Sequence, residues 1–211
     1  TLQSFSINNP ATAAAIDRCE ETRPRILVAA KQRFSQFNYN KTTMAEIAED
    51  CDMSAANLYR FFKNKLDIGA NLACGCLDAK LMLSKEIIEQ RERPATARLH
   101  DVVMQILHYT HGQWANDPRM NELVNAICDA RMDIVDQHKF SEHRLFVDLL
   151  EDGIQRGDFD IGDVHDTATA IITAINAFSM PLMMPLCSLE VFEQRAESVI
   201  RLMLNGLKSR T

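Results

Sequence analysis

Histidine pairs on segments with helical periodicity are the first candidates for chemistry in this sequence. His108 and His111 lie three residues apart, which is about one turn of a helix, and His100 and Asp101 lie about two turns earlier. A second group with similar spacing is His138, Glu142 and His143. Amphipathic helices bring polar residues together in this way whatever the function, and no zinc-type Cys or His spacing is present. We therefore expect no metal and no other cofactor.

The motifs of common catalytic sites are missing from the sequence. It has no Gly-x-Ser-x-Gly motif for a nucleophile and no glycine-rich phosphate loop, and it has only seven glycines. The cysteines are scattered among apolar residues, so we expect reduced thiols rather than a disulfide framework. They are Cys19, Cys51, Cys74, Cys76, Cys128 and Cys187. We do not expect an enzyme.

Basic residues are concentrated near the start of the chain. Residues 18–65 contain nine Lys or Arg and six acidic residues, whereas the whole chain has a formal charge of −6. The remainder of the chain therefore carries −9. A basic head on an acidic body is the asymmetry expected of a protein that binds a polyanion through one domain.

Composition favours an all-helical protein. The 211 residues include seven Gly and six Pro, too few for the many turns of a β protein. No uncharged apolar run of about 18 residues and no signal peptide occurs, so we expect no membrane partner and a cytoplasmic location. The length suits one large domain or two small ones.

The first elements are an arm and a helix. Residues 1–21 are expected to form a flexible N-terminal arm, with some helix near Ala11–Ile16. From Thr22 on, apolar residues recur at helical spacing. Thr22 can cap this helix with Pro24 in its first turn, where the missing N–H costs nothing. The polar run 38–41 is expected to end it.

Two short helices joined by a tight turn are expected next. Thr43 and Glu46 have the spacing of a capping box, which starts the first of these helices. Ser54 caps the second, whose Leu58 and Phe62 are expected to point inward. This order of elements is typical of a helix-turn-helix, although a purely structural helical hairpin has the same pattern.

Residues 69–211 are expected to form a helical body, with one helix spanning Ala95–Asn116 after the break at Pro94. The last two helices, capped by Asp163 and Ser188, are apolar over more than one face. The surplus apolar surface favours a four-helix interface between two copies of the chain. The expected interface residues are Ile171, Ile175, Phe192, Val199, Ile200 and Met203.

Residues 22–72 resemble the DNA-binding domain of the tetracycline-repressor (TetR) family. The residues that carry the resemblance are Thr22-Arg23, Ile26, Ala29-Ala30, Phe34, Tyr39, Thr42-Thr43, Ile47-Ala48, Met53-Ser54, Leu58-Tyr59, Phe62 and Lys65. Such a combination in one order is far more specific than a lone helix-turn-helix.

The resemblance implies an all-α fold of about nine helices. It comprises a three-helix DNA-binding domain at residues 22–68 and an effector-binding and dimerisation domain at residues 69–211. It also implies a homodimer that binds a palindromic double-stranded DNA operator, usually as a repressor, and releases it when a small molecule binds the body. The alternative is a helical ligand-binding or enzymatic protein whose head no longer reads DNA.

The start of the second helix of a helix-turn-helix enters the major groove. Asn57 could pair with adenine there, and an alanine methyl could touch a thymine methyl. The resemblance places Tyr59 and Lys65 at phosphate-contacting positions. The residues expected to contact DNA are Thr43, Ser54, Ala55, Ala56, Asn57, Tyr59, Arg60, Phe61 and Lys65.

Two positions depart from the family pattern. Asp52 stands where the family often has glycine, but Asp tolerates a left-handed backbone better than most residues. Phe61 stands where the family often has His or Tyr, so a phosphate contact is expected to be missing.

The effector is expected to bind between the helices of the body. Met104, Tyr109, Trp114, Met120, Phe178 and Met183 could line an apolar cavity for an apolar or aromatic molecule. The same residues could instead fill the core.

Overall fold

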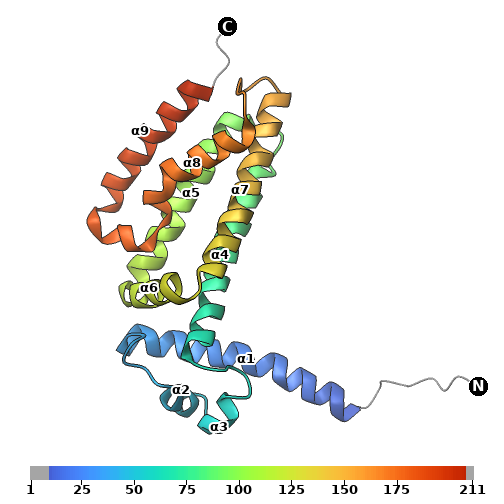
Figure 1. Ribbon diagram of the computed structural model, residues 1–211, viewed down its shortest axis with the longest axis vertical. Helices are drawn as coiled ribbons and strands as arrows, with labels where there is room; N and C mark the ends of the chain where they lie inside the picture. Colours follow the sequence, from blue (N-terminus) through green and yellow to red (C-terminus); the bar gives the residue numbers. More distant parts are fainter. Residues whose placement is uncertain (1–9, 208–211) are drawn as a thin grey trace, which may run out of the picture. The chain divides into compact units, whose positions relative to one another are not determined.

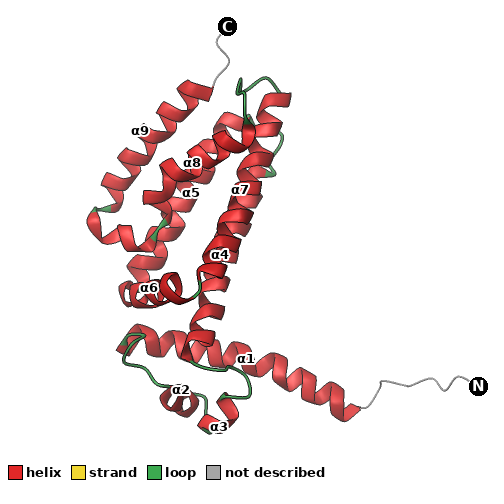
Figure 2. Cartoon of the chain, viewed as in Figure 1, coloured by secondary structure: helices red, strands yellow, loops and turns green. Residues whose placement is uncertain are grey.

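The computed structural model describes the backbone of residues 10–207 and the side chains of residues 21–207. Over this part of the chain every regular element is helical, as Figure 2 shows, so the prediction of an all-α fold is confirmed. The α-helices are α1 (Pro10–Phe37), α2 (Met44–Asp50), α3 (Ala55–Leu58), α4 (Lys65–Ile88), α5 (Ala95–Asn116), α6 (Asn121–Ala130), α7 (Met132–Gln155), α8 (Val164–Ser179) and α9 (Leu189–Leu207). Two 3₁₀ helices, η1 (Pro118–Met120) and η2 (Pro181–Leu186), lie between them (Figure 1).

The chain divides into two compact units. The first, which we call the head, ends at Leu72, and the second, the body, begins at Ala73. The division lies four residues beyond the boundary between residues 68 and 69 expected from the sequence. The helix α4 supplies its first turns to the head and the rest to the body.

The first helix begins earlier than expected. Because α1 starts at Pro10, Thr22 lies inside the helix and does not cap it. Pro24 is also internal, since a helix can continue across a proline at the loss of one hydrogen bond. The helix expected near Ala11–Ile16 is present as part of α1, but it is continuous with the next helix rather than part of a flexible arm. Residues 1–9 of the expected arm lie outside the part described. The helix ends as expected, with Asn38 in a left-handed conformation at φ 69°.

The head has its own apolar core. Ile26 and Phe34 of α1 and Ile47 of α2 are buried together with Leu58 and Phe62, which follow the tight turn. The inward orientation predicted for Leu58 and Phe62 is confirmed. Because α3 is so short, these buried side chains fix its orientation.

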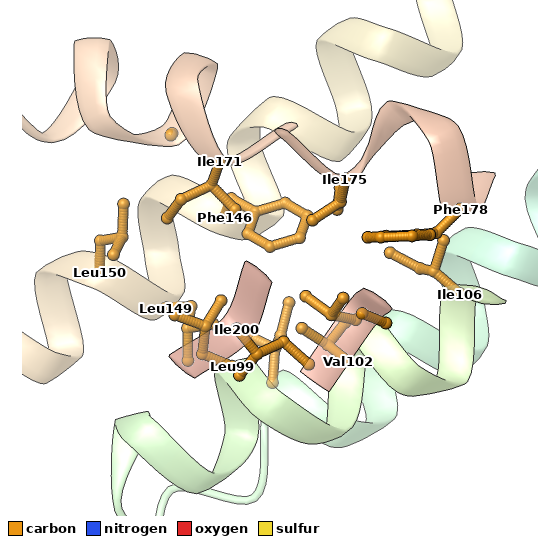
Figure 3. Close-up of a cluster of buried hydrophobic side chains, with 14 of the residues drawn as sticks. Leu99, Val102, Ile106, Phe146, Leu149, Leu150, Ile171, Ile175, Phe178 and Ile200 are labelled. Atoms are coloured by element: carbon orange, nitrogen blue, oxygen red, sulfur yellow. The ribbon is translucent and has the colours of Figure 1, made fainter. Parts of the chain in front are cut away.

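The body is built around α5, which packs against α7, α8 and α9. Its bounds, Ala95–Asn116, are those expected from the sequence. Figure 3 shows how the four helices share one core: Leu99, Val102 and Ile106 of α5 meet side chains of α7, α8 and α9. The expected caps also form, since Asp163 accepts from the amide of Asp166 at 2.9 Å.

A buried arginine ties three elements of the body together. Arg98 of α5 has no exposed surface, and its guanidinium donates to the carboxylate of Asp152 in α7 and, at 2.6 Å, to the carbonyl of Ile88 at the end of α4. Arg91 donates to the other carboxylate oxygen of Asp152 at 3.2 Å. This ion pair fixes how α4, α5 and α7 meet.

Four of the expected dimer contacts are instead core residues. Ile171, Ile175, Phe192 and Ile200 are each at most 3% exposed within their own chain, so they have almost no surface to offer a partner. Periodicity could not separate them from interface residues, because both kinds of position are apolar on the same helices. Val199 and Met203 are half-buried and keep exposed surface.

Candidate DNA-binding site

The second helix is held by a network at its N-terminus. The predicted capping box forms: the amide of Glu46 donates to the hydroxyl oxygen of Thr43 at 3.3 Å, and the amide of Thr43 donates to Oε2 of Glu46 at 2.8 Å. The Thr43 hydroxyl also donates to this carboxylate at 2.8 Å. These bonds lower the pKa of Glu46. Both Thr43 donors that a phosphate would need are thus bonded to a carboxylate, and the predicted phosphate contact would have to displace it.

An ion pair anchors the second helix to the first. Arg33 of α1 donates through its Nη2 to Asp50 at 2.7 Å and lies 3.3 Å from the carboxylate of Glu46. The hydrogen bond from Arg33 lowers the pKa of Asp50. Arg33 therefore positions α2, and its charge is largely neutralised.

The turn between α2 and α3 has the geometry of a helix-turn-helix. Asp52 has φ 54°, in the left-handed region that favours glycine, so the turn survives this departure from the family pattern. Ala48 is only 1% exposed, and its carbonyl oxygen accepts a hydrogen bond from the amide of Met53 at 3.0 Å. Ser54 caps α3 as predicted, accepting from the amide of Asn57.

Most of the residues expected to contact DNA lie between Ser54 and Phe61, on α3 and the turn after it, which we call the recognition segment. Ser54, Ala56, Tyr59 and Arg60 are exposed, and Tyr59 keeps 52% of its surface. The others on this segment, Ala55, Asn57 and Phe61, are half-buried. Because the buried side chains of Leu58 and Phe62 hold this short helix and the turn after it against the head, the exposed side chains can be presented to a groove.

An arginine missed by the sequence analysis fixes the end of this segment. Arg23 of α1 donates to the carbonyl of Phe61 at 2.6 Å, donates to Oδ1 of Asn71 at 3.3 Å, and lies 4.3 Å from the ring centroid of Phe62. The sequence analysis counted Arg23 as a positive charge and as part of the family resemblance, but gave it no partner. Its place one turn before the buried Ile26 was the available signal for a contact with the recognition segment.

Lys65 has three internal partners. Its ammonium donates to the carbonyls of Tyr39, Asn40 and Thr42, at 2.7, 3.2 and 2.8 Å, and lies 4.5 Å from the ring centroid of Tyr39. An ammonium has three N–H donors. Lys65 therefore holds the loop after α1, a role that the sequence did not reveal, and its phosphate contact stays a prediction.

Other basic residues of the head face solvent. Lys63, between α3 and α4, is exposed, and so is Lys41, close to the start of α2. The sequence analysis counted both as charges without assigning them a role. The position of Lys63 directly after the recognition segment was the signal available.

Comparisons with known proteins agree with this geometry. Residues 26–69 match the family described as "Bacterial regulatory proteins, tetR family", and residues 95–200 match "Tetracyclin repressor-like, C-terminal domain". The second match spans half of the chain. The chain belongs to the TetR family. It is a DNA-binding transcriptional regulator.

Individual relatives are distant in sequence. An uncharacterized HTH-type transcriptional regulator of Bacillus subtilis (strain 168), YhgD, is 24% identical over 147 residues, which are 70% of this chain and 76% of that protein. A crystal structure of a TetR-family regulator from Mesorhizobium loti MAFF303099 superposes with a TM-score of 0.71 at 15% identity and covers 91% of this chain and 99% of that one. The fatty acid degradation regulator FadR from Bacillus halodurans gives a TM-score of 0.65 at 18% identity, over 90% and 97% of the two chains. At these identities the two structures show the fold alone.

The body of this TetR-family chain has a hollow of about 560 Å³ over α8, η2 and α9. Of the six residues expected to line an effector cavity, Phe178 and Met183 line it. The other four, Met104, Tyr109, Trp114 and Met120, are half-buried and are not among its lining residues.

Most of the histidines considered for metal binding have other partners, but His138 has none. His108 is hydrogen-bonded to Glu193 at 2.8 Å, and the ring of His111 packs edge-on against Trp114. His143 stacks on His165, away from His138. Over the residues that are described, no group of three or more His, Cys, Asp or Glu could hold a metal ion, and no helix is long and apolar enough to cross a membrane.

Proposed function

We propose that the chain is a cytoplasmic repressor rather than an enzyme. It binds a palindromic operator as a homodimer and is released when a small molecule binds the body. The observation that carries the proposal is the recognition segment: an exposed polar surface from Ser54 to Arg60, oriented from below by Leu58 and Phe62 and from the side by Arg23.

Contacts with DNA fall into two kinds. Asn57 reads an adenine edge, and Ala55 and Ala56 contact thymine methyl groups in the major groove. Tyr59 and Arg60 bind phosphates on either side, together with Lys63, which we add to the expected set because it is exposed beside them. Phe61, whose ring has no hydrogen-bonding group, contributes no phosphate bond.

The dimer interface is proposed on the outer face of α8, η2 and α9. Leu202 is 74% exposed and Leu186 is 66% exposed, and half-buried Val199 and Met203 lie on the same terminal helix as Leu202. Exposed large apolar side chains in one region mark a binding surface. Two such helices from each protomer form a four-helix interface.

Selection of bound fragments from random DNA by the purified protein tests this function. We expect an enriched palindrome, bound by one dimer or a pair of dimers, with an affinity that falls steeply as salt rises in an anisotropy titration. The selection is repeated with protein refolded free of any carried-over ligand. Lack of enrichment in both experiments would contradict the regulator proposal and favour a helical ligand-binding protein with a head that no longer reads DNA.

A further inference from the structure

Three ionisable side chains are buried inside the body where the DNA-binding function does not use them. Lys80 of α4 is 6% exposed, and His138 and Glu142 of α7 are 8% and 7% exposed. On α7 these two lie one turn apart, in a row that continues to the buried Ile134 and Phe146. They therefore interrupt an otherwise apolar face of the helix that points into the protein. We call Lys80, His138 and Glu142 the polar cluster.

The polar cluster is not satisfied from within the protein. Both ring nitrogens of His138 are buried without a hydrogen-bond partner. Lys80 and Glu142 are close enough to influence each other's pKa, but they form no ion pair, and over residues 21–207 neither side chain has a recorded hydrogen bond. Burial lowers the pKa of Lys80, raises that of Glu142 and lowers that of His138 to about 3. Buried groups of these types are normally paired, because an unpaired one costs stability.

Hydrogen bonds to α5 hold α4 in place on both sides of Lys80. Tyr109 of α5 donates from its hydroxyl to the carbonyl of Cys76 at 2.8 Å, one turn before Lys80. Ser84, one turn after Lys80, donates to Gln105 of α5 at 3.3 Å. α4 is thus linked to α5 on both sides of Lys80. The polar cluster combines a side chain of α4 with two side chains of α7 in the interior of the body.

We propose that the polar cluster binds polar groups of the effector, and that the effector is an uncharged, largely apolar molecule carrying a hydrogen-bond acceptor and a separate donor, as in a hydroxyaryl ketone whose two groups are too far apart to bond to each other. The proposal rests on the proposed function, in which a small molecule releases the DNA. The ammonium of Lys80 donates to the acceptor, and the carboxylate of Glu142 accepts from the donor. His138, as a neutral imidazole, can do either.

Charge balance selects an uncharged molecule. The formal charges of Lys80 and Glu142 cancel, so a bound anion would leave the carboxylate uncompensated and a bound cation would leave the ammonium uncompensated. The apolar part of the molecule would lie along the row that contains Ile134 and Phe146. Since Lys80 lies on the helix that begins at Lys65 in the head, a ligand held by Lys80 bears on an element that both units share.

A matched series of naphthalene probes tests the proposal by isothermal titration calorimetry on the full chain. The probes are acetylnaphthol with the ketone and the hydroxyl on different rings, so that the two groups cannot bond to each other, the anion naphthoate, the cation naphthylmethylammonium, and methylnaphthalene without a polar group. We expect acetylnaphthol to bind at least tenfold more tightly than the other three. Tighter binding of either ion, or no binding of acetylnaphthol at millimolar concentration, would overturn the proposed effector class.

Variants locate the site. Lys80→Met, His138→Leu and Glu142→Gln are each expected to weaken acetylnaphthol binding at least tenfold, whereas Lys85→Met, at an exposed lysine of the same helix, leaves it unchanged. We expect His138→Leu and the double variant Lys80→Met with Glu142→Leu to unfold at no lower urea concentration than the parent, because each replaces buried, unpaired polar groups with apolar ones and leaves no single charge behind. Lys80→Met alone removes the counter-charge of the buried Glu142 carboxylate, so we expect that variant to lose stability and judge it by probe binding only.

Two outcomes separate this proposal from the function on which it rests. If the three single variants keep full affinity for acetylnaphthol, or if His138→Leu and the double variant lose stability, the polar cluster is not the effector site. Neither result changes the conclusion drawn from specific operator binding. If the unmodified protein selects no operator, the proposed regulator function is wrong. Calorimetry still decides independently whether the probe binds at the polar cluster.

Discussion

Replacing Lys65 by Met separates a structural lysine from one that binds DNA. The change keeps the length of the side chain and removes the ammonium that joins α4 to the carbonyls of Tyr39, Asn40 and Thr42. A hydrogen bond to a charged group is worth about 1.5–3 kcal/mol when it is well shielded. Because Lys65 is only half-buried, we reduce each of the two short bonds to about 1 kcal/mol and neglect the exposed third bond. The expected loss of stability is thus about 2 kcal/mol.

The two possible roles of Lys65 predict different salt dependence. A lysine that neutralises a phosphate adds about 0.9 to the slope of log K against log salt for each contact. If Lys65 acts only through the three carbonyls, Lys65→Met leaves this slope unchanged, whereas Lys63→Met, at the exposed lysine two residues earlier, lowers it by about 0.9 for each head bound.

Urea unfolding of the full chain and anisotropy titrations on the selected operator at several salt concentrations measure both effects. Lys63→Met serves as the matched control, since it is expected to leave the unfolding midpoint where it is. A Lys65→Met protein that is as stable as the parent but has a slope lower by about 0.9 per head would refute the structural role and restore the phosphate contact.

Three further changes test the body. Leu202→Glu on the exposed face of α9 is expected to shift the sedimentation of the protein from dimer to monomer without lowering its stability. The control Met82→Glu, at another exposed residue, is expected to leave the dimer intact. If the Leu202→Glu protein is still a dimer, the interface lies elsewhere. Gly153→Ala places a methyl group into the ring of a buried phenylalanine and should cost about 1–3 kcal/mol in urea unfolding, so an unchanged midpoint would contradict this packing. Asp152→Ala strands the fully buried Arg98 and should cost about 3–5 kcal/mol; a loss below about 1 kcal/mol would show that water reaches the guanidinium.

Local signals in the sequence predicted the helix boundaries that depend on a few neighbouring residues. The capping box at Thr43, the cap at Ser54 and the break at Pro94 all form as expected, because each depends on a hydrogen bond or a steric clash within one turn. The start of α1 was misplaced for the same reason. Thr22 and Pro24 have the residue types of a helix start, and only contacts beyond that turn decide whether the helix continues through them.

The partners of long charged side chains could not be predicted in this way. Arg23, Arg33 and Lys65 all counted toward a basic head, yet each bonds to carbonyls or carboxylates that are far away in the sequence. A count of charges cannot distinguish a lysine that is hydrogen-bonded to a loop from a lysine that binds a phosphate. Of the nine basic residues counted over residues 18–65, the exposed Arg60 and Lys63 are therefore the stronger candidates for phosphate contacts.

The same difficulty hid the polar cluster, although the sequence contained a signal for it. Lys80 lies on a row with Ser84 and Ile88, four residues apart, and both of these are buried. A lysine on such a row is expected at the surface from its residue type and in the interior from its position. Lys80 is buried, as its position on the row predicts, whereas Lys85 is exposed, as is typical of a lysine. An ionisable residue that breaks an apolar row is therefore a better guide to a ligand site in a helical body than the aromatic and methionine residues that fill its core, because packing alone gives no reason for it to be there.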